Sequence, residues 1–241
     1  MLPDNSLLVT NGGSIVRYDG ANATMDCRMS ALLVGSIRKL YATSPQNIYA
    51  GCNGGGIVHF SDGAWQALQT GTTLDVSDIW GEVDPRTGED VVIAVAGSYA
   101  ATSGNKLLSI RGNTVVHLDD TVLPLYLSGV WFDLHRICFV VGAGIFYSSS
   151  SSPLVWQGGV GRITQYFTGC VRGNAANDVM IAGAYGEILH YNGSTFKSYQ
   201  AMTGFNGSIG AVAVRRNLVI AVGTTYQQGF QQAIAVIGRR P

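Results

Sequence analysis

Ile188-Leu189-His190-Tyr191-Asn192-Gly193 is the clearest copy of a short apolar pattern that recurs along this chain and ends in a turn pair. Asn-Gly and Asp-Gly pairs between apolar runs are the strongest short signals of a β-hairpin. The other copies lie at residues 15–20, 57–63, 107–112, 145–147 and 234–237. Their starting points are about 44 residues apart on average, so the chain is predicted to repeat one small unit of strands.

Each copy follows a longer apolar run, which is typical of a strand buried on both faces. These runs are 7–10, 48–51, 92–97, 137–142, 179–183 and 218–223. A further apolar segment precedes five of the runs, and an aromatic residue opens a fourth segment at Trp65, Trp156 and Phe196. Four strands repeated at this period predict an all-β propeller of about six four-stranded blades, with five or seven as alternatives. We expect residues 1–241 to form one such domain.

The two ends of the repeat are incomplete. The first copy has no recognisable first strand, and the last copy has no fourth strand. Unpaired sheet edges readily pair with other chains. We therefore expect a neighbouring subunit to cover the incomplete terminal blades.

Charge and hydropathy argue against nucleic acid and membranes as partners of this chain. Lys plus Arg and Asp plus Glu each number 15, so the chain has no electrostatic footprint for nucleic acid or an anionic membrane. Charged residues make up only 12%, which suits a protein embedded in an assembly. No apolar stretch approaches ~18 residues, so no membrane span is expected. The first residues do not read as a signal peptide, and we expect an extracellular, cell-surface or virus-particle location.

The cysteine and glycine patterns predict neither a metal site nor a cofactor site. The four cysteines are Cys27, Cys52, Cys138 and Cys170, and no two of them have a short metal-binding spacing. The last three fall in apolar strand patterns, which favours buried free thiols, although a disulfide stays open. The glycine-rich residues 53–56 lack the lysine of a phosphate loop. We expect no cofactor.

Several copies resemble the repeats of bacterial and phage-borne β-propellers, which are similar to kelch-like and Asp-box blades. The resemblance is carried by residues 56–65, 78–80, 177–183 and 186–193, and weaker likeness extends over most of the chain. The Asp-box pattern itself is not met at residues 61–63. The resemblance implies a propeller fold, and a fold does not imply a function.

No set of residues predicts catalysis. The acidic residues lie mostly at turns, where their side chains bond nearby backbone. His59 and His190 occupy the same position in their copies, which favours a structural hydrogen bond between strands over a metal ligand. We expect that the chain is not an enzyme.

Three tyrosines are the best candidates for a binding surface. Tyr99, Tyr185 and Tyr226 follow the long apolar runs, in loops expected on one face of the propeller. Tyrosine supplies rigid amphipathic contact area to protein partners and stacks against sugars. We therefore expect a non-catalytic binding or assembly module that makes protein–protein contacts in a surface or virion-type complex. Its partner would be another protein or a second copy of the chain. A carbohydrate-binding, lectin-like propeller is the alternative, and a glycoside hydrolase is the third hypothesis.

Overall fold

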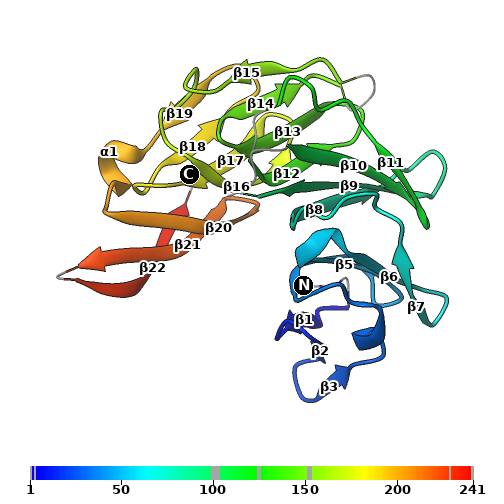
Figure 1. Cartoon of the computed structure of the whole chain (residues 1–241). Coiled ribbons are helices and arrows are strands. Elements are labelled where there is room, and N and C mark those ends of the chain that lie inside the picture. The colour runs from blue at the N-terminus through cyan, green and yellow to red at the C-terminus, as the bar shows by residue number, and fades with distance from the viewer. Residues whose placement is uncertain are drawn as a thin grey trace. The chain divides into compact units, whose positions relative to one another are not determined.

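The computed structural model describes residues 2, 4–98, 104–123, 126–150, 154–227 and 229–239. The described residues form six antiparallel sheets, each built from strands that follow one another in the chain (Figure 1). The fold is therefore an all-β propeller of six blades, as the repeat predicts. The chain divides into two compact units, Met1–Asp120 and Thr121–Pro241. We number the blades 1 to 6 and name the strands of a complete blade a to d.

The first unit holds blades 1 to 3. Blade 1 consists of β1 (Leu7–Thr10), β2 (Ile15–Tyr18) and β3 (Ala23–Asp26). Blade 2 consists of β4 (Ile37–Ser44), β5 (Asn47–Cys52), β6 (Ile57–Ser61) and β7 (Ala64–Leu68). Blade 3 consists of β8 (Val76–Val83), β9 (Asp90–Gly97), β10 (Asn105–Arg111) and β11 (Thr114–His117). Two single-turn 3-10 helices, η1 (Ser30–Leu32) and η2 (Asn53–Gly55), lie in connections.

The second unit holds blades 4 to 6. Blade 4 consists of β12 (Leu127–Asp133), β13 (Ile137–Gly142), β14 (Ile145–Ser148) and β15 (Gln157–Gly159). Blade 5 consists of β16 (Thr168–Ala175), β17 (Asp178–Gly183), β18 (Ile188–Tyr191) and β19 (Phe196–Ser198). Blade 6 consists of β20 (Gly207–Arg215), β21 (Leu218–Gln227) and β22 (Phe230–Arg239). The short helix α1 (Gln200–Thr203) connects blades 5 and 6.

The incomplete blades match the prediction within the described residues. Blade 1 has strands b, c and d but no strand a, and blade 6 has strands a, b and c but no strand d. As a result, β22 pairs with β21 on one side and with no described strand on the other.

Strand b of each complete blade is buried along almost its whole length, and within a unit the side chains of the adjacent blade pack against it. In β9 every residue from Val91 to Gly97 is buried, and in β13 all six residues are buried. One apolar cluster joins Tyr49 and Ile57 of blade 2 to Val92 and Leu108 of blade 3. This explains why the strand b segments are almost continuously apolar and do not alternate.

A glycine at the end of strand b lets the neighbouring strand a approach closely. A Cβ atom added to Gly142, Gly183 or Gly223 would lie 2.0 Å from a carbonyl oxygen at the start of that strand. The pairing register also shifts at this point, opposite a β-bulge in strand a. The recurring terminal glycine therefore has a steric cause.

The Asp62-Gly63 pair makes the tight turn that its sequence predicts. Both residues have positive φ, 52° and 79°, as a type I′ turn between β6 and β7 requires. The turn joins strand c to strand d, which is the connection expected from the repeat.

Burial separates the four cysteines. Cys52, Cys138 and Cys170 are buried free thiols, as predicted, and Cys27 is an exposed free thiol. Burial raises the pKa of Cys52 to about 11 and that of Cys138 to about 12. Because the thiolate is the reactive form, these two buried sulfurs are held in an unreactive state.

In the native protein we expect a chromogenic disulfide reagent to modify one thiol per chain rapidly, and the remaining three only after denaturant is added. The rapid phase should disappear in Cys27→Ser, because Cys27 alone is exposed. Absorbance of the released thiol measures both phases. Rapid modification of two or more thiols in the folded wild type would contradict this burial pattern.

Asp26 links the outer strands of blades 1 and 2. Its Oδ2 accepts hydrogen bonds from the Trp65 indole at 3.0 Å and from Arg28 Nη2 at 2.7 Å. The hydrogen bond from Arg28, aided by those from Trp65 and the Arg28 backbone, lowers the pKa of Asp26 from 3.8 to about 2. Arg28 also donates to the carbonyl of Gly63 at 3.1 Å, so the cluster joins blade 1 to the turn of blade 2.

We expect Asp26→Asn to reduce the free energy of unfolding at pH 7, because it removes a carboxylate that binds Arg28. A folded-state pKa below the unfolded value gives stability that is present above about pH 4 and is lost as the pH falls through 2. The difference in the free energy of unfolding between the wild type and Asp26→Asn should therefore shrink as the pH falls from about 4 through 2. Urea unfolding followed by tryptophan fluorescence measures it, and a gap of equal size at pH 7 and pH 2 would show that ionisation of Asp26 is irrelevant.

Candidate functional site

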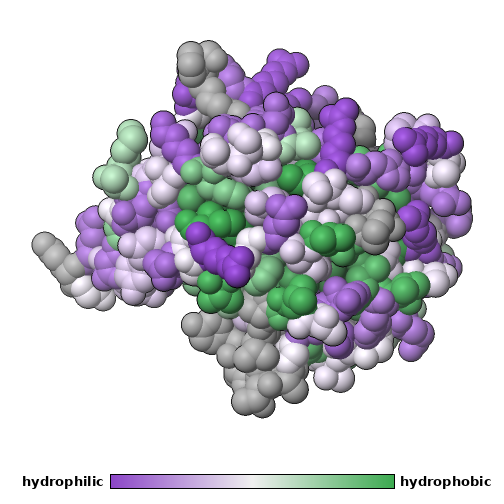
Figure 2. Space-filling model, turned by 90° about the horizontal axis from the view of Figure 1, so that it is seen from above, coloured by the Kyte–Doolittle hydropathy of each residue, from purple (hydrophilic) through white to green (hydrophobic). Residues whose placement is uncertain are grey.

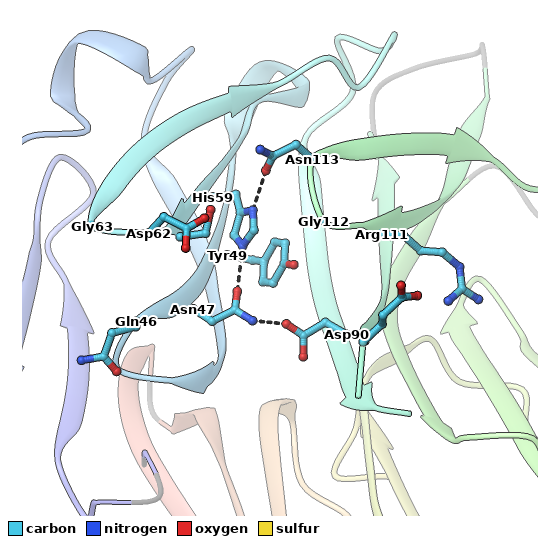
Figure 3. A pocket seen from close by; sticks show the side chains of 12 residues that line it. Gln46, Asn47, Tyr49, His59, Asp62, Gly63, Asp90, Arg111, Gly112 and Asn113 are labelled. Carbon is cyan, nitrogen blue, oxygen red and sulfur yellow. Dashed lines mark hydrogen bonds between the residues drawn. The ribbon is translucent and has the colours of Figure 1, made fainter. Parts of the chain in front are cut away.

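The first unit contains an open pocket of about 860 Å³ between blades 2 and 3 (Figure 3). It is lined mainly by polar side chains from the turns of the two blades. These residues are Gln46, Asn47, Tyr49, His59, Ser61, Asp62, Gly63, Glu89, Asp90, Arg111, Gly112 and Asn113. We call this pocket the polar groove.

Blade topology brings these residues together. The turn between strands a and b and the turn between strands c and d lie at the same end of an antiparallel blade. Gln46 and Asp62 come from these two turns of blade 2, and Glu89 and Asn113 come from the same two turns of blade 3. Blades 2 and 3 share an apolar cluster, so their turns lie next to each other at one end.

His59 is at the centre of the groove's hydrogen-bond network. Its Nε2 lies 2.7 Å from Asn47 Oδ1, and its Nδ1 lies 2.7 Å from Asn113 Oδ1 (Figure 3). The amide of Asn47 donates to Asp90 and, at 2.9 Å, to Thr43 Oγ1. The network therefore connects strands b and c of blade 2 to strand b and the last turn of blade 3.

Asp90 fixes the polarity of this network. A carboxylate only accepts hydrogen bonds, so Asn47 must direct its NH₂ group to Asp90 and its Oδ1 to His59. Nε2 of His59 consequently carries a hydrogen. At Nδ1, the partner is Asn113 Oδ1, and the Asn113 NH₂ group donates to Gln66 Oε1 at 2.5 Å. His59 thus has a hydrogen-bond partner at both ring nitrogens.

Tyr49 forms the floor of the groove. Its ring stacks on the His59 ring with centroids 4.0 Å apart and planes 7° apart. Tyr49 is fully buried, and desolvation together with the charge of Asp90 raises its pKa to about 12. The phenol therefore stays neutral, and the stacked pair holds the imidazole in one orientation.

The rim of the groove carries more acidic than basic residues. Asp62 and Glu89 are exposed and Asp90 is half-buried, whereas Arg111 is the only Lys or Arg among the lining residues. This arrangement suits a ligand that carries amines, guanidinium groups or hydrogen-bond donors.

The His59 contact has a counterpart in blade 5. His190 Nε2 lies 3.0 Å from Asp178 Oδ1, and Asp178 opens strand b of its blade as Asn47 opens strand b of blade 2. Both histidines thus bond the first residue of the adjacent strand, which agrees with the structural role expected from their matching positions. Blade 2 differs because Asn113 and Asp90 extend the contact into the next blade.

The structure places two of the three predicted tyrosines beside one loop of the second unit. Tyr185 lies in the loop between β17 and β18, and Tyr226 lies near the end of β21. The Tyr185 amide donates to Gly207 O at 2.8 Å, and the Tyr226 amide donates to Asn206 O at 2.7 Å. Their side chains are 55% and 52% exposed. Tyr99 lies outside the described residues.

Tyr185 also contacts a neighbouring aromatic residue. Its ring centroid is 5.5 Å from that of Tyr166, and its backbone has a positive φ of 56°. The tyrosines occupy the b–c end of their blades, whereas the polar groove occupies the a–b and c–d end of blades 2 and 3. The second unit therefore presents an aromatic surface of different chemistry from the groove.

Neither a metal cluster nor a membrane-spanning helix is found in the described part of the chain. No group of three or more His, Cys, Asp or Glu side chains there is arranged to hold a metal ion. No helix in these ranges is long and apolar enough to cross a bilayer. Figure 2 shows one face of the molecule, on which apolar and hydrophilic residues are interspersed.

Solved propellers resemble this chain in fold. A structure of YCF48 bound to a D1 peptide is 17% identical with a TM-score of 0.62, and the match covers 91% of this chain and 70% of that one. YCF48 from Cyanidioschyzon merolae is 14% identical with a TM-score of 0.65, over 88% and 72% of the two chains. The computationally designed Ika8 protein is 15% identical with a TM-score of 0.59, over 96% and 79%. No protein-family model and no curated protein matches the sequence.

We expect Asn47→Ala to lower the free energy of unfolding by about 2 kcal/mol, because it leaves Asp90 and one nitrogen of His59 without their partner. Gln46→Ala, at the adjacent exposed position, should change it by less than about 0.5 kcal/mol. Urea unfolding of both variants measures the difference. The network would be energetically unimportant if the two variants were equally stable.

Proposed function

We propose that this chain is a non-catalytic propeller that binds a segment of a partner protein in the polar groove of its first unit. The observation that carries the proposal is the fixed network around His59, which presents amide, imidazole and carboxylate groups along an open pocket of about 860 Å³. Such a set of groups recognises the hydrogen-bonding groups of a ligand at low entropic cost, because the side chains are already held in place.

The charge of the rim specifies the segment further. Asp62 and Glu89 are exposed at the two sides of the groove, so the segment is proposed to carry lysine or arginine. YCF48, whose fold is similar, has been solved with a bound peptide, which supports peptide binding as a use of this fold.

The setting of this binding is a second part of the proposal. The chain has only 12% charged residues and no net charge, which suits a component of a cell-surface or virion-type assembly. Recovery of the chain in a complex of fixed stoichiometry from its native source would support this setting.

We expect a displayed library of random peptides selected on the wild-type chain to enrich sequences with lysine or arginine. Binding of the selected peptides should fall about tenfold or more in the double variant Asp62→Lys/Glu89→Lys and weaken as salt rises, because surface charges are screened. Titration calorimetry at two salt concentrations measures both effects.

A matched control distinguishes binding in the polar groove from binding to the exposed tyrosines of the second unit. Tyr185→Ala/Tyr226→Ala should bind the selected peptides as the wild type does. Loss of binding in this tyrosine variant, with binding kept in the charge-reversed variant, would refute the groove. Binding on a glycan array, with no enriched peptide, would favour the lectin alternative. Turnover in a screen of chromogenic glycosides would instead support a hydrolase.

A further inference from the structure

The outer edge of blade 6 is a second candidate binding site. β22 runs for ten residues, Phe230–Arg239, and pairs with β21 along its full length. No described strand pairs with its other side, where the complete blades have strand d. Strand addition at such an edge is a common mode of peptide recognition, with main-chain hydrogen bonds supplying affinity and pockets supplying specificity.

The other blades show what side chain normally occupies this place. In blades 5 and 6 the bulge of strand a lies opposite Gly183 and Gly223, which makes these two glycines equivalent. Four residues earlier, Val179 and Val219 are therefore equivalent as well.

In blade 5, Val179 pairs with Tyr191 of strand c, which pairs with Phe196 of strand d. In the other two blades we again take the strand b residue four positions before the bulge and follow its pairs across strands c and d. This leads to Trp65 in blade 2 and to Val115 in blade 3. This position of strand d, which we call the anchor position, thus holds a large apolar residue in all three blades.

The anchor side chain closes the apolar cluster between its own blade and the preceding one. Trp65 joins the cluster of blades 1 and 2, and Val115 joins that of blades 2 and 3. Phe196 lies 4.7 Å from the ring of Tyr191 and 5.7 Å from that of Tyr147 in blade 4. Each of these side chains is half-buried although it lies on the outer strand.

Blade 6 has a cavity beside the strand c position that would pair with the anchor. Val219 pairs with Gly238, which has no side chain. A pocket of about 290 Å³ adjoins Gly238 on the face turned toward blade 5. Its apolar lining includes Met180, Ile188, Tyr199, Met202, Val219 and Val236. Met202 beside the pocket is 84% exposed.

The charge at this end of the sheet is positive. Arg215 pairs with Leu218, which pairs with Arg239, so both arginines lie in one row across blade 6. Both are exposed, and Arg239 also lines the pocket. A strand added antiparallel to β22 would place the residue before its anchor opposite Arg239. An acidic residue there would lie directly opposite Arg239 and complement its charge.

We propose that β22 accepts an extended segment of a partner protein as the fourth strand of blade 6. The segment runs antiparallel to β22, places an aromatic or large aliphatic side chain opposite Gly238, and carries an acidic residue just before it. A second copy of the chain is a poorer occupant, because its own anchors Trp65, Val115 and Phe196 already belong to paired strands. This site belongs to the second unit and does not depend on the polar groove.

A synthetic peptide based on strand d of blade 2 tests the proposal. The probe has the sequence of residues 62–69 with Ala64→Asp, so that an acidic residue precedes Trp65, and it carries a fluorescent label. We expect saturable binding to the wild-type chain by fluorescence anisotropy. The peptide with Trp65→Ala should bind about tenfold more weakly or worse, because it lacks the anchor.

Two protein variants locate the binding. Gly238→Leu fills the cavity, and the nearest heavy atom to its Cβ would be Val219 Cβ at 3.8 Å, so the fold should tolerate it. Gly238→Leu should weaken binding of the labelled peptide about tenfold or more. Ala235→Leu changes the same strand on its opposite, exposed face and should bind as the wild type does. Circular dichroism confirms that both variants fold. No binding, or equal binding by both variants, would overturn the proposal.

Hydrogen exchange and sedimentation test the alternative occupants. Alternate amides of residues 230–239 should exchange fast in the free chain and slow down when the peptide is added. The free chain should sediment as a monomer. Slow exchange along β22 without peptide, or a dimer that Gly238→Leu dissociates, would assign the edge to the chain itself or to a second copy and overturn the proposal.

Discussion

Burial of strand b on both faces is the constraint on which this structure depends. In β9 and β13 nearly every side chain is apolar and enclosed, so such a strand is stable only between two other layers. The interior of each unit is consequently filled by aliphatic and aromatic residues. Exposed polar residues are concentrated at the strand ends, where the rim of the groove and the exposed tyrosines lie, although His59 is buried within strand c of blade 2.

The repeat made most of the fold predictable. The Asp62-Gly63 turn, the apolar strand b runs and the absence of strand a from blade 1 are all local patterns, and each is found where the sequence indicates. The polar groove was not predicted, because its network joins His59 to Asn113 and Asp90 of another blade. Contacts between blades leave no periodic trace in the sequence. The one available signal was the matching position of His59 and His190.

The two units offer surfaces of opposite character. The groove of the first unit is polar and mainly acidic, with its side chains already fixed by mutual hydrogen bonds. The edge of the second unit is apolar and positively charged at one end, and its main-chain groups complete a sheet. The proposed ligand of the groove is a basic segment and the proposed ligand of the edge is an acidic, aromatic segment, so the two sites are expected to select different peptides.

The residue opposite the strand a bulge differs between the blades. It is glycine in blades 4, 5 and 6, but cysteine (Cys52) in blade 2 and alanine (Ala96) in blade 3. The backbone of blades 4 to 6 leaves no room for a Cβ atom at this point, whereas that of blades 2 and 3 accommodates a small side chain. One half of the molecule is therefore intolerant of any added carbon at a place where the other half already carries one, so equivalent positions of the repeat are not interchangeable.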